Sequence, residues 1–483
     1  MSCLSIVAIY ILVISVVASL DVAIVGAGIG GASASYFIRN LFPDAKVTVF
    51  ERNEVVGGRL KSFVFNDTNL ELGGSIGVKA NHYFHDIATK LNLTVTSPLS
   101  VRGSYAVFNG TDIIFQSSTS TLVSLSKMVA QYGFAHFLVT PQITSLVSDF
   151  NQIYSFQDKG VGFRTSAELW NALSLLSYTK QTLKETLLQS SFFPVYPFIS
   201  SGFIDEFLSS ITHINYLQSP NTMHSLVGQI GLAPLYSGKE EVFRIEEGNS
   251  KLVSRLLEES GSNLLLSHKV TKISQFYNQE SDQIQWNLTI EGDRNYHTFD
   301  KIVIATPLEH AKIQFEGDDI IVPPEREYQQ LHTTIVKGHI QPEYFGKDSI
   351  SELPTTVGTT STAPFAAFSI LMNLENDGYV VKLFSENALE DAALRSLFKT
   401  GYKVLATAAW DAYPKYHAGQ HMPEFSLSDG LYYLNAIESG GSCIEISAIS
   451  GRNAALMLKQ DLDRRPTSDV NTGLTRRADK TEL

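Results

Sequence analysis

The apolar positions near the start of the chain predict a strand, a helix and a second strand. Residues 22–25 (VAIV) form a short run without polar side chains, which is typical of a strand buried on both faces. Residues 32–40 have helical composition, and residues 46–50 (KVTVF) form a second apolar run that ends at Glu51. Strands that alternate with helices in this way predict a parallel sheet.

Strand patterns of the same kind return in the second half. Residues 242–260 predict a strand, a turn and a helix, and residues 268–273 (HKVTKI) predict a further strand. A polar β-meander follows, and a strand at residues 302–304 comes after it. The order of these elements indicates that the chain returns to the sheet it left after residue 80.

A last unit of this type stands near the C-terminus. Residues 432–436 predict a strand, and Glu438 lies just beyond its end. Residues 440–441 are two glycines that predict a turn, and Ser442 is a suitable N-cap for a helix that runs to about Met457.

The intervening segments have a different character. Residues 81–240 mix helical patterns with aromatic patches, and residues 311–425 are similarly mixed. Core packing explains most of these aromatic residues whatever the function. Because 483 residues exceed the usual size of one domain, we predict an α/β fold in which a Rossmann-like domain is interleaved with an α+β domain.

Composition and charge narrow the class of partner. The net charge is −12, which argues against nucleic acid because phosphate binding requires a positive surface. The two cysteines are Cys3, in a leader-like segment, and Cys443. With Cys3 removed, an intrachain disulfide and a cysteine-based metal site are excluded, and Cys443 is interpreted as a small core residue.

The N-terminus predicts a secretory route. Residues 6–18 are apolar and small residues follow, so residues 1–19 predict a signal peptide cleaved near Ala18 or Ser19. A membrane anchor is the alternative, although the apolar run is shorter than the roughly 20 residues of a membrane span. Four glycosylation sequons agree with secretion; they begin at Asn66, Asn92, Asn109 and Asn287.

The turn after the first strand predicts a dinucleotide site. Gly26, Gly28 and Gly31 form G-x-G-x-x-G. The first glycine permits the tight turn, the second lets a pyrophosphate approach the backbone, and the third lets the helix pack on the sheet. The helix N-terminus supplies amides to the phosphates. Glu51, 20 residues beyond Gly31, can accept hydrogen bonds from an adenosine ribose, and both NAD and FAD fit so far.

Residues 57–59 (GGR) favour FAD. They resemble the second motif of the amine-oxidase-like FAD superfamily, in which the glycines lie against the diphosphate region and an arginine, here Arg59, meets anionic oxygens. Residues 73–75 (GGS) form a third close-approach site, which in that superfamily runs near the isoalloxazine ring.

The same resemblance implies roles for later segments. The backbone at Val270 would pair with the adenine edge, Ala305 and Thr306 would form a turn near the adenosine, and Glu438 would bind the ribityl chain. The helix after Ser442 would direct its positive end at the flavin. The residues predicted to hold non-covalent FAD are Gly26, Ala27, Gly28, Gly31, Glu51, Arg52, Gly58, Arg59, Gly73, Gly74, Ser75, Val270, Ala305, Thr306 and Glu438.

From residue 21 to residue 458 the chain resembles the prenylcysteine oxidase and farnesylcysteine lyase family. Leu217 and Glu247 depart from the resemblance, because both stand where a family glycine is expected. The stretches that carry it are "INYLQS" (214–219), "HSLVGQIGLA" (224–233), "VFRIEEGNSKLV" (242–253), "AAWDAYPKY" (408–416) and "LYYLNAIES" (431–439).

The resemblance implies an FAD-dependent thioether oxidase. Its substrate would be S-farnesyl or S-geranylgeranyl cysteine, which O2 and water would convert to cysteine, the prenyl aldehyde and hydrogen peroxide. FAD would carry the redox step, so no side-chain nucleophile is needed. The FAD-binding domain would comprise residues 20–80, 241–310 and 426–458, and the substrate domain residues 81–240 and 311–425.

The sequence allows alternative functions and alternative compartments. Another flavin amine oxidase and a catalytically silent FAD-binding relative are alternative functions. His213 and His224 are more readily explained as structural residues than as a base. A lipophilic substrate suggests access from a membrane surface. The family suggests the lysosome. Residues 459–483, a polar tail predicted to be disordered, end in KTEL, which is similar to an ER-retention signal; release from the cell is the third alternative.

Overall fold

A parallel sheet forms the centre of the first half of the molecule. The computed structural model describes residues 19–99, 104–189, 200–236, 241–280, 282–360 and 363–464. The strands of this sheet are β1 (Asp21–Val25), β2 (Lys46–Phe50), β10 (Asn263–Leu265), β14 (Lys301–Ile304), β21 (Ser426–Ser428) and β22 (Leu431–Tyr433). They lie in the order β10-β2-β1-β14-β22-β21, and all neighbours are parallel except β21 and β22.

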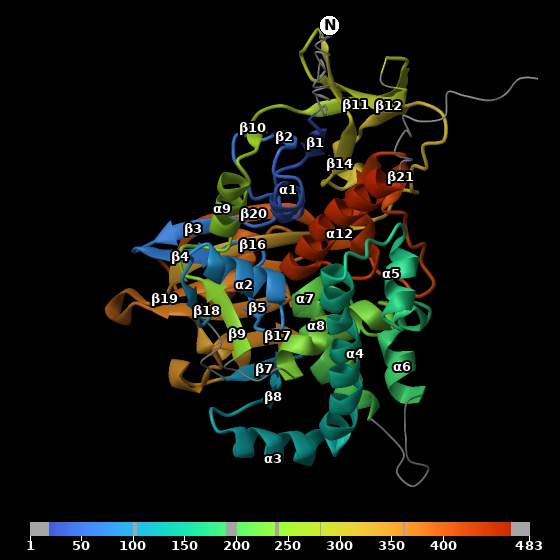
Figure 1. The fold of residues 1–483 in the computed structure, drawn as a ribbon. Helices are drawn as coiled ribbons and strands as arrows, with labels where there is room; N and C mark the ends of the chain where they lie inside the picture. Colours follow the sequence, from blue (N-terminus) through green and yellow to red (C-terminus); the bar gives the residue numbers. More distant parts are fainter. Residues whose placement is uncertain are drawn as a thin grey trace, which may run out of the picture.

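Helices cover one face of this sheet and a β-meander covers the other. The helices are α1 (Ile29–Leu41), α9 (Ser250–Ser260) and α12 (Ile444–Asp463), and α1 lies between the other two (Figure 1). The meander comprises β11 (Val270–Asn278), β12 (Gln283–Ile290) and β13 (Tyr296–Phe299). Phe299 of the meander meets Phe50 edge to face at 5.8 Å. Burial on both faces explains why β1 and β14 are almost wholly apolar.

A second sheet forms the other half. Its strands are β7 (Tyr105–Phe108), β8 (Ile113–Gln116), β16 (Tyr328–Gly338), β17 (Thr356–Thr359), β18 (Ala367–Asn373), β19 (Tyr379–Ser385) and β20 (Lys403–Pro414). They lie in the order β20-β16-β19-β18-β17-β7-β8. All neighbours are antiparallel except β17 and β7. The sheet therefore joins residues from two distant parts of the chain.

Further helices pack on this second sheet and on one another. They are α3 (Thr121–Tyr132), α4 (Ala135–Asp158), α6 (Leu183–Gln189), α7 (Ser209–Tyr216) and α8 (Ser225–Tyr236). Helix α3 lies at the end of the molecule farthest from β1 (Figure 1). Smaller elements complete the fold: β3 (Ser62–Phe65), β4 (Thr68–Glu71), β5 (Gly77–Val78), β6 (Val95–Thr96), β9 (Val242–Ile245), α2 (His82–Lys90), α5 (Ser166–Ala172), α10 (Leu308–Ala311) and α11 (Asp391–Leu397).

The predicted interleaved α/β fold is confirmed, with corrections near the C-terminus. The predicted strand at residues 432–436 ends at Tyr433, and a 3-10 helix, Leu434–Ser439, replaces the rest. The N-cap of α12 is Cys443 rather than Ser442. The helix continues to Asp463, beyond the predicted end at Met457, so the prediction of a disordered tail is wrong for residues 459–463. Tertiary contacts hold these last turns: Tyr432 Oη donates to Asp461 Oδ2 at 2.7 Å.

The domain boundaries also need adjustment. Residues 311–316 were assigned to the substrate domain, but β15 (Gln314–Glu316) pairs in parallel with β11 of the meander. Helix α2 was assigned there too, yet Phe84 and Ile87 belong to the same apolar cluster as β1. Both pairings join residues distant in sequence, which a local pattern does not reveal.

The predicted signal peptide and the predicted C-terminal tail lie mostly outside the part of the chain that the structure describes. In the described part of the chain, no helix has the length and apolar character that a membrane span requires. Residues 1–18 of the predicted signal peptide and residues 465–483 of the predicted tail lie outside the described residues.

Candidate active site

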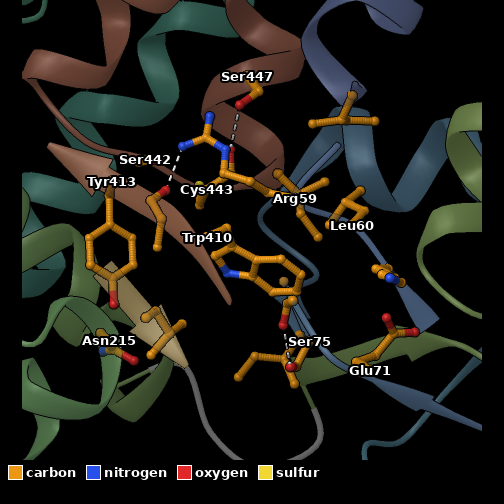
Figure 2. Close-up of a pocket in the computed structure, with 18 of the residues that line it drawn as sticks. Arg59, Leu60, Glu71, Ser75, Asn215, Trp410, Tyr413, Ser442, Cys443 and Ser447 are labelled. Carbon is orange, nitrogen blue, oxygen red and sulfur yellow. Dashed lines mark hydrogen bonds between the residues drawn. The ribbon is translucent and has the colours of Figure 1, made fainter. Parts of the chain in front are cut away.

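A large cavity lies between the two halves of the molecule. Its volume is about 1730 Å³, and it begins at the β1–α1 turn and continues over one face of the second sheet. Figure 2 shows Trp410 of β20 in the middle of it, with Arg59 on one side and Ser75 on another. Both sheets contribute to the lining, so the cavity is a site that neither half forms alone.

The β1–α1 turn has the features of a phosphate cradle. Gly26 has φ +108°, in the region that favours glycine, and a Cβ on Gly31 would overlap the carbonyl oxygen of Gly26. No side chain caps the N-terminus of α1, and Gly28, Ile29 and Gly30 line the cavity. The positive end of α1 therefore faces the cavity with its first backbone amides, as an anion requires.

A Cβ on Gly28 would meet no described atom closer than Gly57 O at 3.9 Å. Gly28 is in an extended conformation, with φ −80°, so the fold itself does not require glycine at this position. The bare backbone at Gly28 therefore indicates close approach by a ligand.

Glu51 lies where the cradle meets the end of β2. Its side chain is 6% exposed, and it lines the cavity together with Arg52. Glu51 Oε2 accepts a hydrogen bond from Ala27 N at 2.9 Å, and Oε1 accepts from Asn53 N at 2.9 Å and from Asn53 Nδ2 at 2.7 Å. A carboxylate has about four acceptor sites, so capacity remains for a ribose hydroxyl.

Arg59 and Glu438 were each predicted to contact the cofactor, and the structure pairs them with each other. The Arg59 guanidinium forms an ion pair with the Glu438 carboxylate, which also accepts from Tyr328 Oη at 2.8 Å. Burial favours a raised pKa for Glu438, but the charges of Arg59 and Arg326 and the hydrogen bonds outweigh it and lower the pKa. Glu438 is therefore an anion that holds Arg59 in the cavity wall.

The third predicted glycine site packs against both Arg59 and the second sheet. A Cβ on Gly73 would overlap Arg59 O and would lie 3.3 Å from Trp410 Cζ2. Ser75 Oγ donates to Gly73 O at 2.8 Å. This segment therefore lies tightly between the backbone of Arg59 and Trp410 of β20, and no side chain larger than hydrogen fits at residue 73.

Nearly all residues predicted to bind the cofactor come together around the cavity. Ala27 and Gly31 do not line it: Ala27 donates to Glu51, and Gly31 lets α1 pack on β1. The predicted residues that line it are Gly26, Gly28, Glu51, Arg52, Gly58, Arg59, Gly73, Gly74, Ser75, Val270, Ala305, Thr306 and Glu438. Bare backbone, an uncapped helix N-terminus, a strand-end acid and a cation fit a dinucleotide such as FAD.

Beyond the cradle the cavity is largely apolar. Its floor is the second sheet, with Leu331, Ala367 and Phe384 on neighbouring strands. A π-helical turn, Phe203–Leu208, precedes α7, and Phe207 of this turn lines the cavity. Further apolar lining residues come from α3, α7 and α8: Leu125, Met128, Ile211, Ile214, Pro234 and Leu235.

Sequence reasoning did not identify the polar residues on this side. Trp410 and Tyr413 lie in the stretch "AAWDAYPKY" and Arg244 lies in "VFRIEEGNSKLV", so a signal for these three existed, whereas none marked Lys382. Cys443 was interpreted as a core residue, but its side chain opens into the cavity. The thiol is accessible from the cavity but is surrounded by protein on its other sides, and this desolvation raises its pKa to about 11, so it is protonated at neutral pH.

The two histidines considered as bases both lie outside the cavity lining. His224 is completely buried and its Nε2 contacts Ser439 O at 2.9 Å; burial lowers its pKa to about 4. His213 Nδ1 contacts Thr359 O at 3.2 Å. Both interactions hold backbone segments together, in agreement with a structural role.

The chain is similar to known proteins in sequence and in structure. The family described as "Prenylcysteine lyase" matches residues 115–471, and the "NAD(P)-binding Rossmann-like domain" matches residues 24–91. The chain is 31% identical to farnesylcysteine lyase from Arabidopsis thaliana, over 94% of this chain and 92% of that protein. It is also 31% identical to human prenylcysteine oxidase 1, over 90% of this chain and 88% of the relative.

The solved structures agree on the fold. Cyclohexylamine oxidase from Brevibacterium oxydans superposes with a TM-score of 0.57 at 14% identity and covers 92% of this chain and 100% of its own. A triple mutant of putrescine oxidase, redesigned in cofactor binding, also gives a TM-score of 0.57, at 13% identity, and covers 92% and 99%. At these identities the likeness extends to the fold alone.

Proposed function

The chain belongs to the prenylcysteine lyase family, and we propose that it is an FAD-dependent oxidase that cleaves the thioether of S-prenylated cysteine. The observation that carries this function is the continuity of the cavity. The dinucleotide cradle and a long apolar floor belong to one chamber, as oxidation of a small lipophilic molecule at a bound cofactor requires.

The balanced reaction follows from the bond that must break. The carbon between sulfur and the alkene loses two electrons and a proton, water adds to it, and the C–S bond then breaks to give cysteine and the prenyl aldehyde. O2 takes up the electrons and becomes hydrogen peroxide. When bound, FAD supplies the two-electron acceptor between substrate and O2.

The residues of the chain provide binding and exclusion. Bare backbone at Gly28 and Gly58 and the N-terminus of α1 would hold the cofactor diphosphate, and Glu51 a ribose. Leu331, Phe384 and the helices above them would hold the prenyl chain, since burial of each CH2 contributes about 0.8 kcal/mol. The protonated thiol of Cys443 gives no support to a nucleophilic side chain in the reaction.

The test is spectroscopic. The purified protein is expected to contain oxidised flavin, and anaerobic farnesylcysteine is expected to bleach it, with cysteine and farnesal released in equal amounts when air is admitted. A flavin that farnesylcysteine leaves oxidised would contradict the proposal.

An amine oxidase is the second candidate, because Trp410 and Tyr413 bring two aromatic side chains into the cavity (Figure 2). Bleaching by an alkylamine but not by farnesylcysteine would favour it. The catalytically silent alternative rested mainly on Glu247. Glu247 lies outside the cavity lining, where its carboxylate accepts hydrogen bonds from Thr94. The departure at Glu247 therefore gives no reason to expect inactivity.

We also propose that the substrate enters from a lipid bilayer. The surface of α3 and the start of α4 exposes Leu122 (80%), Val123, Phe134 (67%), Phe137 and Leu138. The inner side of the same helices lines the cavity through Leu125, Met128 and His136. Residues 113–148 contain no Asp or Glu, in a chain with 49 acidic residues, so this surface does not repel anionic lipid.

Vesicle binding tests this docking. The wild-type protein is expected to co-sediment with vesicles of phosphatidylcholine and phosphatidylserine, and Phe134→Asp to reduce the bound fraction severalfold. Tyr296→Asp is the matched control, since Tyr296 is 65% exposed on the distant β13. Equal binding by both variants, or a dimer in solution that Phe134→Asp dissociates, would contradict the bilayer as occupant.

The compartment remains part of the proposal. We propose entry into the secretory pathway through the signal peptide, glycosylation at exposed Asn66, Asn92 and Asn109, and delivery to the lysosome. Imaging a protein tagged behind the signal peptide, with KTEL intact or deleted, distinguishes lysosome, ER and release from the cell.

A further inference from the structure

Two buried cations lie in the cavity wall away from the cofactor cradle. Lys382 on β19 and Arg244 on β9 are each 8% exposed, and both line the cavity. Lys382 makes one hydrogen bond to the described residues, from Nζ to Ser75 Oγ at 2.6 Å. Arg244 Nη1 reaches two backbone carbonyls at 3.3 and 3.5 Å, and its buried Nε has no partner among the described residues.

One acid, Glu71, accompanies the two cations, and its carboxylate is already used. Glu71 Oε1 accepts from Asn249 N at 2.7 Å and Oε2 accepts from Ser62 Oγ at 3.1 Å. Burial raises the pKa of Glu71, and the charges of Lys382 and Arg244 act in the opposite direction. In the described part of the chain, neither cation forms an ion pair within 4.0 Å, so this corner of the cavity has excess positive charge.

The Lys382 ammonium lies over the ring of Phe384, with Nζ 4.5 Å from the ring centroid, which compensates part of its burial. An anion is needed to compensate the rest, because a buried ammonium with spare donors is unfavourable. An ammonium has three N–H donors, and Lys382 uses one of them. Burial lowers the pKa of Lys382 to about 8, yet the cation still predominates at neutral and acidic pH. The site therefore fits a carboxylate of a ligand that enters the cavity.

The register of the sheet places polar and apolar positions in adjacent rows. Lys382 lies opposite Ser369, Ser369 opposite Thr356, and Thr356 opposite Tyr105, and all four line the cavity. Two residues along β19, Phe384 lies opposite Ala367 in an apolar row that also lines it. A molecule with a small charged head and a long apolar tail matches these two rows.

We propose that Lys382 binds the α-carboxylate of the S-prenylcysteine head group, with Arg244 as the second cation of the subsite. This assignment rests on the proposed function. It fixes the polar end of the substrate beside Ser75 and Trp410, where the two halves of the molecule meet, and leaves the apolar row for the prenyl chain. Lys382 is then a substrate-binding residue that determines which atom of the ligand stands at the cofactor.

The test measures binding to the holoenzyme without turnover. S-dodecyl-L-cysteine has the head group but no alkene, and S-dodecylcysteamine lacks only the carboxylate. Titration calorimetry is expected to show at least about tenfold tighter binding of the cysteine derivative to the wild-type protein, the usual worth of a charge-assisted contact. In Lys382→Met the two ligands are expected to bind within about twofold of each other, with the cysteamine affinity unchanged.

Two variants serve as controls. Lys382→Arg keeps the charge and is expected to keep most of the preference. Lys337→Met changes a lysine on the neighbouring β16 that pairs with Asp377 outside the cavity, and is expected to match the wild type. A preference that survives in Lys382→Met, or a wild-type protein that binds both ligands equally or neither, would overturn the assignment.

The outcome is separable from the proposed function. If farnesylcysteine fails to bleach the flavin while the carboxylate preference depends on Lys382, the anion subsite stands and the thioether oxidase does not. If farnesylcysteine is oxidised and the preference does not depend on Lys382, the reverse holds.

Discussion

Two glycines of the β1–α1 turn should respond to the same substitution in opposite ways. In Gly31→Ala the new methyl would overlap the carbonyl oxygen of Gly26 and lie 3.2 Å from Ala305 Cβ, so α1 must move away from β1. In Gly28→Ala the nearest described atom is Gly57 O at 3.9 Å, and the backbone is extended rather than left-handed. The fold therefore requires glycine at residue 31, whereas at residue 28 only a bound ligand requires it.

The expected magnitudes follow from these distances. Gly31→Ala should lower the free energy of unfolding of the apoprotein by about 1–3 kcal/mol, the usual cost of overpacking. In Gly28→Ala the poorer N-cap costs about 0.5 kcal/mol, and the stiffer unfolded chain returns about 0.4–1 kcal/mol. Apoprotein stability should therefore stay within about 0.5 kcal/mol of the wild type.

Gly28→Ala should instead weaken the binding of FAD. A methyl pressed against a bound diphosphate costs about 1–3 kcal/mol, which raises the FAD Kd roughly five- to 150-fold in Gly28→Ala. Urea unfolding of the apoprotein and fluorescence titration with FAD measure the two quantities. Gly202→Ala controls for glycine loss alone, because Gly202 has φ −57°, no atom lies within 4 Å of the new methyl, and the residue is outside the cavity lining. An unchanged FAD Kd in Gly28→Ala would refute the placement of the diphosphate.

Three further outcomes are expected. Glu438→Gln should lower the free energy of unfolding by about 3 kcal/mol in urea titrations, because it leaves Arg59 without its buried anion; since the pKa of Glu438 is lowered, the wild-type advantage should disappear as pH falls below 4.5, and an advantage that persists at lower pH would contradict the pairing. Leu217 has φ +51° at the end of α7 and is 8% exposed, so Leu217→Ala should cost about 2–5 kcal/mol, and Leu217→Gly should be about 1 kcal/mol more stable than the alanine variant; the usual helix order, alanine above glycine, would show the strain is absent. Glu445 is 1% exposed and burial raises its pKa from 4.5 to about 7, so the free energy of unfolding should fall by about 3 kcal/mol as pH rises from 4.5 to 7, and Glu445→Gln should flatten this slope in pH-dependent urea unfolding; an unchanged slope would assign the pH dependence to other groups.

The cofactor half of the site was predictable because its signals are local. A phosphate is bound by backbone amides, so the requirement for bare backbone appears as glycines within a few residues of one strand. Glu51 follows β2 directly, and the end of a strand in a parallel sheet is where ligands gather. Gly26, Gly28 and Glu51 could therefore be identified from spacing alone.

Partnerships between distant residues were not predictable. Arg59 and Glu438 were each assigned to the cofactor, but they are 379 residues apart in sequence and the fold brings them into one ion pair. The end of α12 was predicted too early for the same reason, since Asp461 is held by Tyr432 and Arg164. The partners of a side chain depend on the tertiary structure, and local patterns in a single sequence do not reveal them.

The substrate half differs from the cofactor half in how specificity is built. Lys382, Ser75 and Arg244 come from three separate sheets or segments, and only the antiparallel register of β18 and β19 and the packing of β9 bring them to one cavity wall. A shift of one residue in that register would turn Lys382 away from the cavity and expose its neighbours instead. The cradle can therefore be retained while the rows of the floor change. This separation explains how chains at 13–14% identity share one fold. It also means that Lys382 and the apolar row, and not the glycines, determine which substrate fits.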